Sequence, residues 1–383
     1  MTELISRNRA GEKLRKSVRR TMSILLSLVL PAALPAQTSL TVREFENFLL
    51  SRHAQTESDA LLARQLAFIQ LSQQLTDAKL AKLVPKLRIG PQSAEQIELI
   101  AAASVFDVPP PDDLPSQSPP DSLEQNRILQ AAREYAHVFA RRLPDFLAVR
   151  STQSYDNAPQ FPAGKRSRKS EPVFLIHFVG ARRRQVAVRG GLEASASHAD
   201  SGAPDSDHAE GMTTWGEFGP LLTTVVDDAQ AGTIAWSRWQ NGAGGARLAV
   251  FHYTVPRSAS HDFVDLWSSG PLASPPLRSF SDKPAYQGEL YIDPASGTIL
   301  GITLNAELSP ESPVLLSRLA VQYAPVEIAG KMYVCPVRGV AVSVVHNQDM
   351  ELMDGGRPER FVNLVYFTEY HKFASTSRIL TNR

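Results

Sequence analysis

The chain has 383 residues, of which 43% are hydrophobic and 21% charged, a balance typical of globular proteins rather than of disordered or fibrous ones. Its formal net charge is +1, but residues 1–36 hold seven basic and two acidic residues, which leaves 33 basic and 37 acidic residues in the remainder. A mildly acidic remainder gives no electrostatic reason to expect nucleic-acid binding, which depends on neutralising phosphates. The only cysteine, Cys335, excludes an intrachain disulfide, and we expect it to be a buried structural residue.

Residues 1–36 have the features of a secretory signal peptide. Basic residues precede an apolar run over residues 22–34, and Pro35 and Ala36 follow it. The apolar run is shorter than the about 20 residues that a membrane-spanning helix needs, which favours cleavage after Ala36 over a membrane anchor. We therefore expect a periplasmic or secreted protein that is not an integral membrane protein after cleavage.

Residues 37–107 have the hydrophobic periodicity of short amphipathic helices and are predicted to form a small helical module. Thr41 and Glu44 have the spacing of a capping box, in which each side chain accepts from the other's backbone N–H. The expected helices begin after Thr41, span residues 58–75, span residues 76–84 up to Pro85, and run from a cap at Ser93 to about Phe106. Their apolar stripes are expected to form the core of the module.

Residues 108–121 are rich in proline, which lacks a backbone N–H and fixes φ. We expect a stiff, extended linker between two domains.

Residues 122–383 are predicted to form an α+β domain. A long helix over residues 121–143 has an apolar stripe through Ile128, Ala132, Tyr135 and Phe139. The expected strands cover residues 146–155, 173–178, 185–189, 232–239, 248–255, 319–323, 331–345, 361–367 and about 375–380, and one further helix covers residues 215–228. Short connections favour antiparallel pairing. The predicted fold is a large, curved antiparallel sheet, a half-barrel, with helix on its concave face.

Residues 288–308 are the clearest β-hairpin in this domain. Leu300, Ile302 and Leu304 alternate with small or polar residues, which predicts that they share one face. The turn is expected at residues 293–298, where Pro294 fixes φ and Gly297 can adopt a positive φ.

Five apolar residues are candidate ligand contacts. Trp236 and Trp239 are three residues apart on an expected strand, so we expect them to face opposite ways, one toward a cavity. Leu300, Ile302 and Leu304 supply a one-sided apolar surface. The predicted ligand is a lipid or another apolar molecule.

Catalytic motifs of the common hydrolase and nucleotide-binding types are not found in the sequence. The loop at residues 198–210 contains His198, Asp200, Asp205, Asp207, His208 and Glu210, and we interpret it as a solvated acidic loop. The basic run at residues 165–169 is interpreted as a solvated loop as well. We therefore expect no catalytic residue, no cofactor and no metal. The alternative is a hydrolase or metal-dependent enzyme that uses the acidic loop.

Two resemblances follow from these segments. Residues 215–219, 248–256, 286–299 and 321–336 resemble recurrent segments of uncharacterised exported bacterial proteins, which share this order of signal peptide, helical module and β-rich region. The helix and long sheet from about residue 122 resemble the periplasmic lipoprotein-carrier (outer-membrane lipoprotein-sorting) fold, an open half-barrel that holds acyl chains on its concave face. The first resemblance implies organisation only, and the second implies lipid binding.

Two main functions are expected. The first is a non-enzymatic exported protein that binds a lipid or other apolar ligand in the half-barrel. The alternative is a protein-interaction or envelope-assembly component whose concave face is filled by its own side chains. A cavity lined by Leu, Ile and Trp favours the first, and a filled core with an apolar patch on the helical module favours the second.

Overall fold

The computed structural model describes residues 38–54, 58–87, 89–158, 176–195, 211–212, 216–242, 245–262, 264–267, 280–346 and 358–372, which belong to one compact unit. Several predicted features lie outside these residues: the signal peptide, the basic run at residues 165–169, residues 173–175 of a predicted strand, the acidic loop at residues 198–210, the first residue of the helix predicted at residues 215–228, and the last strand near residues 375–380.

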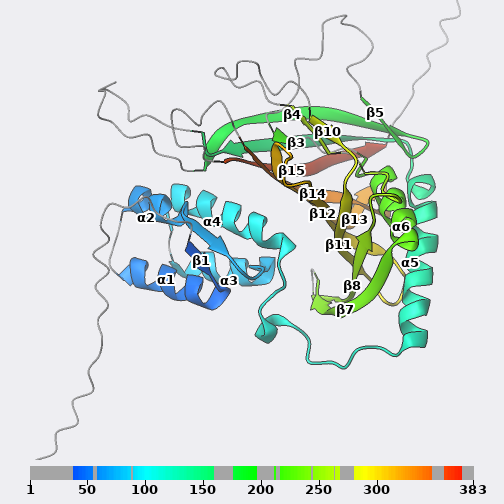
Figure 1. The fold of residues 1–383 in the computed structure, drawn as a ribbon, viewed down its shortest axis with the longest axis horizontal. Coiled ribbons are helices and arrows are strands. Elements are labelled where there is room, and N and C mark those ends of the chain that lie inside the picture. Colours follow the sequence, from blue (N-terminus) through cyan, green and yellow to red (C-terminus); the bar gives the residue numbers. More distant parts are fainter. Residues whose placement is uncertain are drawn as a thin grey trace, which may run out of the picture. The chain divides into compact units, whose positions relative to one another are not determined.

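The helical module folds around its own core, as predicted. Four helices are joined by a parallel pair of short strands, and the elements are β1 (Thr38–Leu40), α1 (Val42–Ala54), α2 (Asp59–Leu66), β2 (Ile69–Leu71), α3 (Asp77–Leu87), α4 (Pro91–Ala103) and the 3₁₀ turn η1 (Ser104–Phe106) (Figure 1). The capping box is confirmed: the backbone N of Thr41 donates to Glu44 Oε2 at 2.8 Å, and the backbone N of Glu44 donates to Thr41 Oγ1 at 3.3 Å.

The second predicted helix is too long. It ends at Leu66, and Ile69 and Leu71 are the buried residues of strand β2, with exposed Gln70 between them. In this short apolar stretch a helical and a strand pattern cannot be distinguished by periodicity alone. Residues 69–71 form a strand because they pair with β1.

The ends of the next two helices also differ from the prediction. Helix α3 continues past Pro85 to Leu87. Helix α4 begins at Pro91, and its cap is supplied by Asp59 of α2, whose carboxylate accepts from the backbone N of Gln92 and of Ser93 at 3.0 Å each. A cap that comes from another helix has no local signature in the sequence.

The large sheet confirms the predicted α+β class. Ten strands pair antiparallel in the order β5-β4-β3-β15-β14-β13-β12-β11-β8-β7. They are β3 (Phe146–Asp156), β4 (His177–Arg189), β5 (Leu192–Ser195), β7 (Thr233–Asn241), β8 (Arg247–Val255), β11 (Ala285–Ile292), β12 (Ile299–Glu307), β13 (Val314–Ile328), β14 (Lys331–Val345) and β15 (Glu359–Lys372). A smaller sheet contains β6 (Gly211–Met212), β9 (Val264–Trp267) and β10 (Phe280–Asp282).

One face of the large sheet packs against two helices, α5 (Ser122–Arg142) and α6 (Pro220–Ala231), and the sheet bends around them (Figure 1). The predicted stripe of α5 is buried here, since Ile128 is 0% and Phe139 is 2% exposed. Helix α6 begins five residues later than predicted because Pro220 occupies its first turn, where the missing N–H costs nothing.

The opposite face of the sheet packs against the helical module. Leu99 and Ala102 of α4 belong to one buried cluster with residues of four strands: Tyr155, Ala320, Val340, Val342, Val362 and Leu364. The module therefore docks on the sheet, a point that the sequence left open.

Two strands are longer than predicted. Strand β4 runs without a break from His177 to Arg189, where two strands, at residues 173–178 and 185–189, are predicted. The middle of this strand contains exposed arginines, among them Arg182 and Arg183, so it lacks the alternation of apolar and polar residues that predicts a strand. Strand β13 likewise extends from Val314 to Ile328 around the predicted residues 319–323.

The Pro-rich segment lies along the edge of the sheet. Ser118 O accepts from Trp239 Nε1 at 2.9 Å, and Asp113 O accepts from Asn241 Nδ2 at 3.2 Å. Apart from the short 3₁₀ turn η2 (Pro111–Asp113), residues 108–121 form neither helix nor strand, and these hydrogen bonds hold them to β7. Their role as a linker between two domains stays a prediction.

Candidate binding site

The two predicted tryptophans lie on the same face, so the prediction that they face opposite ways is wrong. A β-bulge separates them: Trp236 is opposite Phe251, whereas Arg238 is already opposite Val250, so Ser237 is an extra residue. The bulge restores both indoles to the face that α5 and α6 cover. Their ring centroids are 4.8 Å apart at 70°.

A second β-bulge divides the predicted leucine and isoleucine surface. Tyr291 is opposite Gly301 and Ile292 is opposite Ile299, so Leu300 is the extra residue. Ile302 and Leu304 pack in the core beneath α5 and α6, whereas Leu300 packs with Tyr291 on the other face. The prediction that all three residues share one face is therefore wrong.

The four candidates on the helix-covered face are packed among the protein's own side chains. Ile302 is 2%, Leu304 4% and Trp239 7% exposed. Trp236 packs edge-on against Phe251, with ring centroids 5.4 Å apart. Their part in ligand binding stays a prediction.

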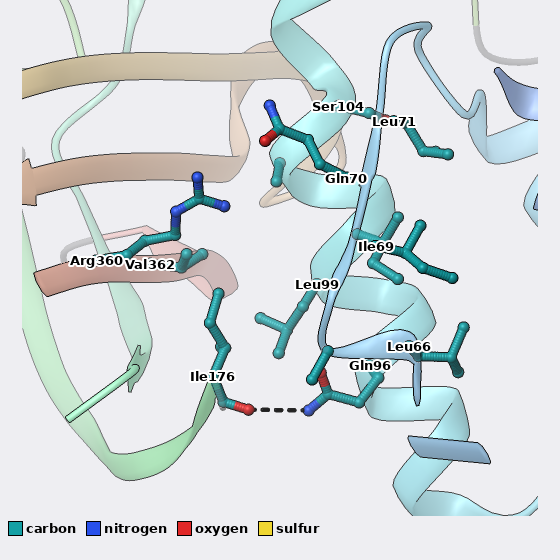
Figure 2. A pocket seen from close by; sticks show the side chains of 13 residues that line it. Leu66, Ile69, Gln70, Leu71, Gln96, Leu99, Ser104, Ile176, Arg360 and Val362 are labelled. Atoms are coloured by element: carbon teal, nitrogen blue, oxygen red, sulfur yellow. Dashed lines mark hydrogen bonds between the residues drawn. The ribbon is translucent and has the colours of Figure 1, made fainter. Parts of the chain in front are cut away.

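A cavity lies elsewhere, between the helical module and the opposite face of the sheet (Figure 2). Aliphatic side chains from both sides line most of it, and Arg360 of β15 stands among them; these lining residues include Leu66, Ile69, Leu99, Ile100, Val362 and Arg360. Its volume of about 30 Å³ is room for about two water molecules. At one end, Gln96 Nε2 donates to Ile176 O at 3.2 Å and joins the module to the sheet (Figure 2).

Helix α4 makes this site because it is apolar on two sides. Ile97 and Ile100 point into the core of the module, whereas Leu99 and Ala102 pack against the sheet. A helix that is apolar nearly all round is buried on more than one side. This feature of residues 97–102 is the signal by which the site could have been found from the sequence.

Strand β15 carries the corresponding signal. Val362 and Leu364 face the module, and the alternate residues Val365 and Phe367 face α5 and α6. A strand with apolar residues at both odd and even positions is buried on both faces. The sequence therefore indicates that both faces of this strand are covered. It does not indicate which segment covers the second face.

Two arginines lie at this junction of the module and the sheet, and Arg360 is the one that lines the cavity. Burial lowers the pKa of Arg360, and the positive charge of Arg318 lowers it further. Arg318 donates through Nε to Asn305 Oδ1 at 3.1 Å and lies over the ring of Phe106 at 5.7 Å. Beside this ring, burial raises the pKa of Asp107, and Arg318 partly offsets that rise.

Further polar contacts hold the module to the sheet at its margin. Tyr366 OH donates to Glu98 Oε1 at 2.6 Å, and Arg338 Nη1 approaches Asp77 Oδ1 at 3.5 Å. The Asp77 side chain is 71% exposed, so its ion pair is worth little.

Buried Asp228 of α6 is the centre of a different polar cluster. Its Oδ1 lies 2.6 Å from His261 Nδ1, and its Oδ2 accepts from His261 N at 2.6 Å and from Tyr286 OH at 2.8 Å. Both oxygens are therefore satisfied, and the cluster anchors the segment after β8 onto α6. We interpret it as a structural anchor.

Buried Glu217 and half-buried Glu193 of β5 form another pair of neighbouring carboxylates. Glu217 approaches Arg150 Nη2 at 3.3 Å, and its side chain is 1% exposed. Burial raises the pKa of Glu193, and the neighbouring Glu217 raises it further. Within the part of the chain that the structure describes, no group of three or more His, Cys, Asp or Glu residues is arranged to hold a metal ion.

Cys335 is buried, as predicted, and burial raises its pKa to about 12. The thiolate is the form that attacks electrophiles and binds metals, so this shift lowers the reactivity of Cys335 at neutral pH.

No protein-family model and no curated protein matches the chain. Among solved structures, the chain is similar to a LolA superfamily protein from Nitrosomonas europaea, with 10% sequence identity, coverage of 67% of this chain and 97% of that chain, and a TM-score of 0.25. A TM-score of 0.25 is too low to support an assignment of fold or function. The fold class therefore rests on the strands and helices of this chain. The resemblance to exported bacterial proteins stays a prediction.

Among the described helices, none has the length and apolar character needed to cross a membrane.

Proposed function

We propose that this chain is a non-enzymatic exported protein that binds an apolar or amphiphilic ligand between helix α4 and the sheet. The observation that supports this proposal is the aliphatic-lined cavity where two separate cores meet. The proposed site therefore lies on the opposite face of the sheet from the half-barrel interior that the sequence favoured.

The volume of the cavity determines how a ligand would enter. Pockets for small molecules usually have volumes of about 300 Å³ or more, and this one has about 30 Å³. An acyl chain therefore fits only when α4 moves away from β15. The module has its own core, which includes Phe45, Leu49 and Ile97, so it can move as a unit.

The apolar residues at this junction make the closed state favourable without ligand. Separating α4 from the sheet would expose Leu99, Val362 and Leu364, each less than 5% exposed in the closed state. Exposed apolar area costs about 25 cal/mol per Å². An acyl chain that covers the same area offsets this cost, so the ligand would favour the open state by its own burial.

The partner-protein alternative rests on the filled core beneath α5 and α6. Ile302 and Leu304, which were expected to face a ligand, pack there against the protein's own helices. In this alternative, the segment that displaces α4 belongs to another envelope protein.

Native mass spectrometry with lipid extraction tests the proposal. The protein should be purified from the exported fraction of its own host, where we expect its N-terminus to be Gln37. A stoichiometric lipid mass that is lost on denaturation is expected.

Two matched variants assign that ligand to the site. Ala103 lines the cavity at the end of α4, and Ala103→Leu fills it with an aliphatic side chain. Ala60 is exposed on α2, so Ala60→Leu makes the same change in the same module away from the cavity. We expect at least a tenfold loss of ligand occupancy, about 1.4 kcal/mol, in the first variant only. An apoprotein mass that takes up no added acyl ligand would reject the proposal and direct the search to partner proteins.

A further inference from the structure

We infer that the ligand carries an anionic head group, a carboxylate or a phosphate, which Arg360 binds with the help of Arg318. This inference rests on the proposed function, because it concerns the polar end of the same site.

Arg360 lies where a head group would be placed. It is two residues from Val362 on β15, so both side chains are on the face toward the module. Both line the cavity (Figure 2). A single-chain amphiphile with its head at Arg360 would lay its chain over Val362 and against Leu99 of α4.

The electrostatics favour an anion at this position. Arg318 is near enough that its charge lowers the pKa of Arg360, so the two half-buried guanidinium groups repel each other. An anionic head group at Arg360 would be attracted by both positive charges. A cationic head group would be repelled by both, and a neutral head group would gain no charge–charge attraction.

The chemistry of the guanidinium group suits the inferred anions. Its planar fork of N–H donors binds a carboxylate or a phosphate through two parallel hydrogen bonds. Such bonds are stronger in a partly buried site than in water because the effective dielectric constant is lower.

Calorimetric titration with matched twelve-carbon probes below their micelle concentrations tests the inference. The probes are dodecanoate, dodecyl phosphate, dodecanol and dodecyltrimethylammonium. We expect at least one anionic probe to bind at least tenfold more tightly than dodecanol, and the ammonium probe to bind more weakly still. A preference between the two anionic probes would distinguish a fatty acid from a phosphate-bearing lipid.

Variants of the arginine separate its charge from its packing. Arg360→Gln should bind the anionic probes no more tightly than dodecanol, whereas Arg360→Lys should retain part of the preference. Arg141 is exposed on α5, so Arg141→Gln removes one charge away from the site and should change nothing. Urea unfolding of each variant confirms that it is folded.

The outcomes distinguish the two proposals. If dodecanol binds as tightly as the anionic probes and Arg360→Gln has no effect, the head-group inference is wrong and the apolar site remains. If no probe binds to the wild-type protein, the proposed function fails.

Discussion

The two faces of the large sheet are covered in different ways. Beneath α5 and α6, large aromatic side chains interlock: Phe218, Phe251 and Tyr253 are all 0% exposed. Toward the module, most of the contact residues are aliphatic, although Tyr155 and Phe106 also take part, and a cavity lined in part by Arg360 lies among them. The first face is one large buried cluster, whereas the second is the junction at which the smaller clusters of the module and the sheet meet within one compact unit.

Edge-to-face aromatic packing explains why the first face should not open. Phe218 contacts Phe367 with ring centroids 5.2 Å apart at 85°, and Tyr253 contacts Tyr286 at 6.0 Å and 81°. Such pairs add about 0.5–1.5 kcal/mol beyond their buried area and depend on their relative orientation. No aromatic ring of α4 takes part in the second face, since this helix has none.

The largest expected effect comes from breaking the first face. Phe251→Ala should lower the free energy of unfolding by about 3–5 kcal/mol, because it leaves a cavity among the fully buried residues. Urea unfolding measures the change. The control is Leu123→Ala on α5, where the side chain is 79% exposed and the change should stay within about 0.5 kcal/mol. Equal losses in both variants would contradict the assignment of this face as the core.

A smaller effect is expected at the second face. Leu99→Ala should cost about 2 kcal/mol, at the low end for such a change, because the adjoining cavity shows that packing there is already incomplete. Hydrogen exchange should become faster in α4 and β15 while α5 keeps its protection. Ile97→Ala is the matched control on the other side of α4, and it should increase exchange throughout the module. If Leu99→Ala also released α5, the two faces would not open independently.

The smallest effect is expected at Cys335, which reports on the first face. The ordinary thiol pKa of 9.0 is raised to about 12, so the folded chain keeps its proton where the unfolded chain loses it. The stability that this burial contributes is present below about pH 9 and is lost as the pH rises toward 12. At pH 8, iodoacetamide should label Cys335 only in urea, and neither ligand nor Leu99→Ala should change this. Labelling of the folded Leu99→Ala variant would show that opening the second face also opens the first.

The local features of this protein followed from its sequence. The Thr41 and Glu44 capping box, the stripe of α5 and the hairpin turn at Gly297, where φ is +73°, each depend on residues within one or two turns of chain. Their patterns could be predicted because the interactions that make them are between neighbours. The α+β class followed in the same way from the spacing of strands and helices.

Only the tertiary structure decided which residues meet. A β-bulge adds one residue without changing composition, so the faces of Trp239 and Leu300 could not be read from alternation. The sequence showed that α4 and β15 are apolar on two sides, which requires two partners for each. It did not show that they are partners of each other, because that choice depends on how the module docks on the sheet, and this docking creates the cavity beside Arg360.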